Sequence, residues 1–88
     1  MQEQINASKA GQEAQVILDK IAKLPNCHAI QVIYAQGEGT WFSCCHPALG
    51  TTFEVLVTRP QTVYLLIKRL NRKGYALLNR HYEFLITD

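Results

Sequence analysis

The chain has 88 residues, of which 48% are apolar and 18% are charged, and its formal net charge is +2. This size predicts one domain, residues 1–88, with a modest core that self-association could extend. Because no apolar run reaches the roughly 18 residues of a membrane span, and the first residues lack the apolar centre of a signal peptide, we expect a cytoplasmic protein with no membrane partner.

Residues 8–24 are predicted to form the first helix. Ser8 is a suitable N-cap residue, and Pro25 with Asn26 is expected to end the helix. Apolar residues at helical spacing form one face of this helix: Ala10, Ala14, Ile17, Leu18 and Ile21.

Three strands are predicted next, at residues 27–35, 40–46 and 51–57. The short turns between them favour an antiparallel meander. Apolar alternation places Ile30 and Val32 on the face that packs against the helices. If the first turn spans residues 36–39 without a bulge, residues whose numbers sum to about 75 lie opposite each other.

Residues 58–74 are predicted to form the second helix, around which the rest of the chain is organised. Thr58 and Gln61 have the spacing of a capping box, and Pro60 suits the first turn of a helix. Gly74 can adopt the positive φ that closes a helix. The apolar stripe consists of four residues at i, i+3, i+4 and i+7: Val63, Leu66, Ile67 and Leu70.

After this helix, residues 75–78 form a short apolar run, Asn79 and Arg80 a predicted turn, and residues 81–87 a final strand. The fold class is therefore α+β: an antiparallel sheet of four to five strands with two helices packed on one face. The element order is α-β-β-β-α-β, with a final β-hairpin as the alternative ending. The predicted core contains these residues: Ile17, Leu18, Ile21, Ile30, Val32, Tyr34, Phe53, Val55, Val57, Val63, Leu66, Ile67, Leu70, Phe84 and Ile86.

The second face of the sheet is predicted to be unusually apolar for a surface in contact with solvent. We expect it to carry Ala29, Ile33, Phe42, Cys44 and Leu56. Such a face favours a protein partner or a second copy of the chain. Ile33, Phe42 and Leu56 are therefore the candidate residues of a protein interface.

The cysteines and histidines raise two chemical alternatives. Cys27, Cys44 and His46 are expected on one face at one end of the first hairpin, where a zinc site would still need a ligand such as His81. A nucleophilic cysteine would be Cys44 or Cys45 beside a histidine, but no sequence motif supports such a pair. Buried cysteines that behave as small apolar residues are the simpler interpretation. We therefore predict no metal, no cofactor and no catalytic residues, and from the odd number of cysteines we expect all three to be reduced.

The charge is distributed unevenly along the chain. Residues 1–58 carry three basic and five acidic residues, whereas residues 59–88 carry six basic and two acidic ones. Five basic residues of the last third are candidate nucleic-acid contacts: Lys68, Arg69, Arg72, Lys73 and Arg80. Such side chains neutralise phosphates, although cations in the last turns of a helix also complement its dipole.

The sequence thus favours a small non-enzymatic binding or regulatory protein that acts through protein contacts. Its expected partners are a second copy of itself, as a homodimer, and an unidentified protein. Nucleic-acid binding through the basic second helix, residues 59–73, is the alternative. The two functions differ in salt dependence, because phosphate contacts release counterions and apolar contacts do not.

Overall fold

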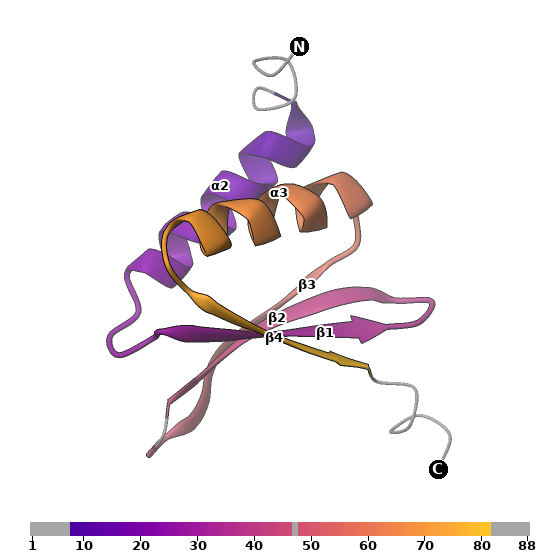
Figure 1. The fold of residues 1–88 in the computed structure, drawn as a ribbon. Helices are drawn as coiled ribbons and strands as arrows, with labels where there is room; N and C mark the ends of the chain where they lie inside the picture. The colour runs from indigo at the N-terminus through magenta and orange to yellow at the C-terminus, as the bar shows by residue number, and fades with distance from the viewer. Residues whose placement is uncertain (1–7, 47, 82–88) are drawn as a thin grey trace.

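The structure, a computed structural model, describes residues 8–46 and 48–81. Two helices cover one face of a four-stranded sheet (Figure 1). The elements follow in this order: α2 (Lys9–Ala22), β1 (Ala29–Ala35), β2 (Gly39–His46), β3 (Gly50–Val57), α3 (Pro60–Arg72) and β4 (Ala76–His81). The predicted α+β class and the order α-β-β-β-α-β are confirmed.

The sheet is mixed, with the strand order β3-β2-β1-β4. β1 and β2 are antiparallel, as are β2 and β3, but β4 is parallel to β1. The prediction of an all-antiparallel sheet is therefore wrong at this pair, because α3 carries the chain from one edge of the sheet to the other. The predicted turn at Asn79 and Arg80 is also wrong, since β4 continues through both residues.

The hairpin of β1 and β2 differs by one residue from the expected register. Ala35 lies opposite Gly39, so the loop has three residues, and Val32 pairs with Phe42. A shift of one residue moves every side chain of a strand to the other face. Phe42 is consequently 0% exposed in the core, and its prediction as an interface residue is wrong, as is the placement of Cys44 on the second face.

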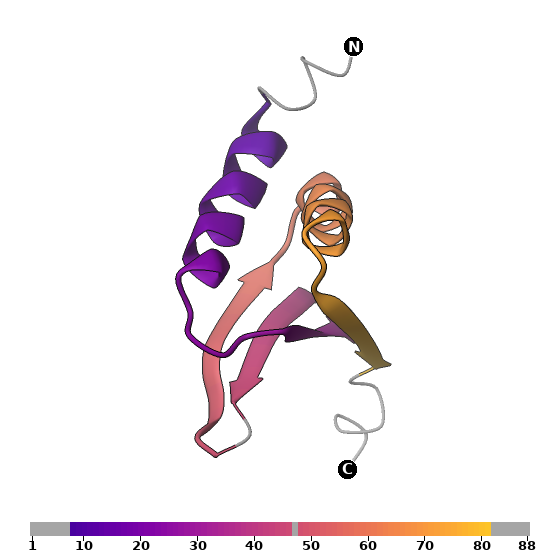
Figure 2. The same cartoon turned by 60° about the vertical axis from the view of Figure 1, so that its left-hand side comes forward.

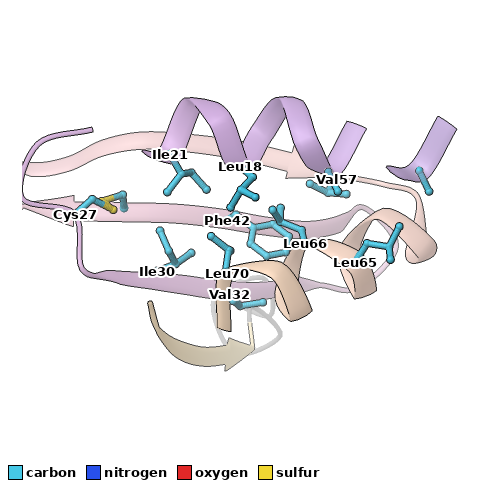
Figure 3. Close-up of a cluster of buried hydrophobic side chains, with 13 residues drawn as sticks. Leu18, Ile21, Cys27, Ile30, Val32, Phe42, Val57, Leu65, Leu66 and Leu70 are labelled. Carbon is cyan, nitrogen blue, oxygen red and sulfur yellow. A yellow bond between two sulfur atoms is a disulfide. The ribbon is translucent and has the colours of Figure 1, made fainter. Parts of the chain in front are cut away.

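The core lies between the two helices and the sheet (Figure 3). Among the described residues, the predicted core residues lie in this core or pack against it, with one exception. Tyr34 is 44% exposed at the end of β1, so its assignment to the core is wrong. Phe84 and Ile86 lie outside the described residues. Six buried core residues were not on the predicted list: Ala10, Ala14, Cys27, Phe42, Cys44 and Leu65.

Helix-end signals in the sequence locate both helices. Ser8 caps α2 as predicted, because its hydroxyl accepts a hydrogen bond of 3.2 Å from the backbone N–H of Gly11. The predicted capping box of α3 is wrong: Arg59 occupies the N-cap position, and its side chain makes no capping hydrogen bond. Gly74, with φ of +97°, follows the last turn of α3 as predicted.

Candidate functional site

The face of the sheet opposite the helices, called the open face below, is covered by none of the described helices or strands (Figure 2). Trp41 of β2 pairs in register with Ile33 of β1 and with Leu56 of β3, so the three side chains form a row across the sheet. Leu78 of β4, opposite Gln31 in the register, is 46% exposed. The structure thus brings together two of the predicted interface residues, and Trp41 takes the place of Phe42.

Trp41 is half-buried within this row. Its indole Nε1 is inaccessible to solvent and has no hydrogen-bond partner among the described residues. A buried donor that gives up water without gaining an acceptor costs stability. The open face therefore contains one unsatisfied polar group beside its apolar side chains.

A second surface, called the helix groove below, lies between α2 and α3 and has a volume of about 770 Å³. Lys68, Arg72 and Tyr64 line it from α3, and Gly11 and Gln15 line it from α2. Gly11 is buried in α2, and its backbone oxygen accepts a hydrogen bond from α3. Tyr64 is 60% exposed.

Arg69 joins the two walls of the helix groove. Its guanidinium donates hydrogen bonds to the backbone oxygen of Gly11, at 3.1 Å, and to Oε1 of Gln15, at 3.3 Å. Nearby, the ammonium of Lys68 lies 5.2 Å from the centroid of the Tyr64 ring, a cation–π contact across one turn of α3.

Four of the five predicted nucleic-acid contacts line the helix groove: Lys68, Arg69, Arg72 and Lys73. The fifth, Arg80, is not on α3. It lies in β4, paired in register with Ile33 of β1. The basic residues of the last third are therefore divided between the helical layer and the sheet.

Comparisons of the chain with known protein families, with curated proteins and with solved structures find no match. Its function has to be inferred from the geometry of the open face and the helix groove.

A polar cluster at the start of α3 ties this helix to α2. The buried hydroxyl of Thr62 donates a hydrogen bond of 2.7 Å to Oε1 of Glu13, and the Nε of Arg59 donates to the same oxygen at 3.2 Å. The hydrogen bond from Thr62, followed by the contact with Arg59, lowers the pKa of Glu13 below its ordinary value. The cluster is a structural connection between helices and lies outside both surfaces.

The cysteines form a bond that the sequence did not predict. Cys27 and Cys44 lie together at one end of the hairpin, as expected, but they are joined by a disulfide, so the prediction of three reduced cysteines is wrong. Cys45 is free and exposed. His46 accepts hydrogen bonds at Nδ1 from the backbone N–H groups of Ala48, at 3.0 Å, and Leu49, at 3.3 Å.

No three His, Cys, Asp or Glu side chains of the described residues gather where they could hold a metal ion. The two sulfur atoms of the proposed zinc ligands are instead bonded to each other. None of the helices in the described part of the chain is long and apolar enough to cross a membrane.

Sequence reasoning missed the contribution of α2 to the helix groove and the position of Trp41. Gly11 was a usable signal, because a glycine inside an amphipathic helix often marks close contact with another segment. Trp41 could have been placed only with a three-residue hairpin loop, which the two glycines at positions 37 and 39 permit.

Proposed function

We propose that this chain is a small non-enzymatic binding or regulatory protein, and that it acts through protein contacts made by the open face. The observation that carries the proposal is the row of Ile33, Trp41 and Leu56, which crosses three strands. Within the row Ile33 is buried, Trp41 and Leu56 are half-buried, and the neighbouring Leu78 is 46% exposed. Apolar side chains that remain partly exposed in this way favour binding of another protein.

A second copy of the chain is the partner that suits this surface best. A homodimer with twofold symmetry brings the same patch of both copies together, which a continuous apolar row permits. Two sheets packed face to face lie about 10 Å apart, and the side chains of their inner faces interdigitate. Glu54 of β3, which pairs with Ser43 of β2, is an exposed acidic residue. Because β3 is an edge strand, this carboxylate can stay in solvent.

Light scattering at tens of micromolar (roughly the weak end of stable association) tests the homodimer. The wild-type chain should have twice the mass of one chain, and Leu56→Glu or Leu78→Glu should give the mass of a single chain. Each substitution places a carboxylate in the proposed interface, where it would lose water without gaining a partner.

Val16→Glu is the matched control, because Val16 is also an exposed apolar residue, 54% accessible, but lies on α2. This variant should remain dimeric. A wild-type chain that is monomeric at these concentrations contradicts the homodimer. An unidentified protein would then be the partner to seek, by capture with the wild-type chain but not with Leu78→Glu.

We propose the cytoplasm as the compartment, because three cysteines, an odd number, do not suggest the disulfide framework of a secreted protein. The disulfide between Cys27 and Cys44 weighs against this location, because disulfides persist mainly in oxidising compartments. Blocking free thiols at the moment of cell lysis and then measuring the mass of the protein would decide the matter. Three blocked thiols support the cytoplasm, and one supports an oxidising compartment.

A further inference from the structure

The helix groove is strongly basic. Lys68, Arg72 and Lys73 are exposed along its α3 side, and Arg69 is held across it by its bonds to α2. None of the described residues that line the groove is acidic, and Asp19, which follows Gln15 by one turn of α2, accepts a hydrogen bond of 2.9 Å from the amide of that residue. Glu13 of α2 is engaged instead with Thr62 and Arg59. The groove therefore attracts an anionic ligand along its length.

The groove also offers an aromatic ring beside these cations. Tyr64 is 60% exposed, and the ammonium of Lys68 lies 5.2 Å from its ring centroid. A planar ring next to a row of positive charges is the combination that binds single-stranded nucleic acids, in which bases stack on aromatic side chains while the backbone follows a basic groove.

We propose that the helix groove binds single-stranded nucleic acid, with Lys68, Arg72 and Lys73 contacting phosphates and Tyr64 stacking on a base. A single strand suits this site better than a duplex, because α2 forms the opposite wall of the groove. A helix that reads duplex DNA has to enter the major groove, whereas the basic side of α3 faces a neighbouring helix.

This site is independent of the open face. The helices and the open face lie on opposite sides of the sheet (Figure 2). A dimer formed through the open face would therefore leave one helix groove accessible on each outer side. The failure of one proposal leaves the other standing.

The test is a fluorescence anisotropy titration with labelled oligo(dT), oligo(U) and a DNA duplex of the same length, at two salt concentrations. The wild-type chain should bind the single strands more tightly than the duplex. Replacing Lys68, Arg72 and Lys73 together by Ala should weaken binding and lower the salt slope by about two units, since each phosphate contact of a single strand contributes about 0.7.

Tyr64 provides a second, separate readout. Tyr64→Ala should weaken binding by about 5- to 150-fold without changing the salt slope, because a stacked ring releases no counterions. Tyr64→Phe retains a ring and should bind like the wild type. These substitutions lie on an exposed side chain and should leave the fold intact.

The matched control replaces Lys9, Lys20 and Lys23 by Ala. All three are exposed, none lines the groove, and the net charge falls by the same amount. This variant should keep most of the affinity of the wild type. Equal losses in both triple variants would overturn the proposal, since net charge alone would then explain binding.

Two further outcomes would also overturn it. One is an affinity no tighter than about 10⁻⁴ M at low salt, which is weaker than ordinary non-specific binding. The other is a preference for the duplex, for anionic lipid vesicles or for an acidic peptide, with no dependence on Tyr64. The ligand would then be a polyanion recognised by charge, without base stacking.

Discussion

At the scale of single residues, Thr62 shows how one hydroxyl can be both buried and satisfied. It is 0% exposed, and its hydrogen bond to Glu13 is the main reason that the pKa of Glu13 is lowered. Thr62→Val keeps the shape of the side chain and removes the donor. The pKa of Glu13 should therefore rise toward its ordinary value, which NMR titration of the Glu13 carboxyl group measures directly.

The loss of stability caused by Thr62→Val should depend on pH. Because the pKa of Glu13 is lower in the folded chain than in the unfolded chain, its contribution to stability is present above the unfolded-state pKa and is lost as the pH falls through the folded-state value. The loss of stability in Thr62→Val should thus be greater at about pH 7 than at about pH 2.5. Thr62→Ser retains the donor and serves as the control. An unchanged pKa of Glu13 in Thr62→Val would show that the hydrogen bond is not its cause.

Trp41 carries an unsatisfied indole N–H, which costs about 1–3 kcal/mol in a buried setting. Trp41→Phe removes this donor and keeps an aromatic ring in the row, so the free energy of unfolding should be equal to or greater than that of the wild type. Trp41→Ala loses the packing as well and should be destabilised. Urea unfolding of dilute samples compares the three chains without the contribution of self-association. A Phe variant as unstable as the Ala variant would contradict the interpretation.

At the scale of elements, α3 is the helix whose core contacts hold the two layers together. Leu66 is 0% exposed and contacts the core directly, whereas Ile67 is only partly buried. Leu66→Ala should therefore cost about 2–5 kcal/mol of unfolding free energy, and Ile67→Ala should cost less. Tyr64→Ala, on the exposed side of the same helix, should be nearly neutral and controls for helix propensity. Urea unfolding measures all three, and equal effects would show that the stripe has been assigned to the wrong face.

The helices could be predicted from the sequence because their signals are local. The spacing of apolar residues in each helix, the N-cap at Ser8 and the closing residue Gly74 all act within a few positions of each other. Thr58 misled because Pro60 is the first residue of the helix, which places Arg59 and not Thr58 at the N-cap position.

The candidate site was less predictable, because strand faces depend on register. A hairpin loop of three residues instead of four moved Phe42 into the core and Trp41 onto the open face. The helix groove depends on which helices become neighbours, and Arg69 meets Gly11 only after the chain has folded. The parallel partner of β4 was equally hidden, since local sequence does not specify which edge of the sheet a strand will join.

At the scale of the whole molecule, the disulfide joins the segment before β1 to β2 and so closes a loop that contains the β1–β2 hairpin. Cys27 and Cys44 are 17 residues apart, and a loop of about this length contributes roughly 3 kcal/mol by restricting the unfolded chain. Reduction should therefore lower the free energy of unfolding by about that amount. Urea unfolding with and without dithiothreitol is the measurement.

A variant with both Cys27→Ser and Cys44→Ser is the control, and its stability should not respond to the reductant. Without reductant, a thiol reagent should label the wild-type chain once, at Cys45, which is exposed. Three labels on the folded, unreduced protein would contradict the disulfide.

The parallel pairing of β4 with β1 has a consequence for how the chain is made. Ala29 pairs with Ala76, so β1 emerges from the ribosome long before its second neighbour has been synthesised. In that interval β2 and β3 can already pair, while the other edge of β1 has unpaired backbone groups that can join a strand of another chain. The chain then crosses the sheet through α3, which brings β4 to this edge. We expect the nascent protein to be most prone to misassembly just before β4 appears.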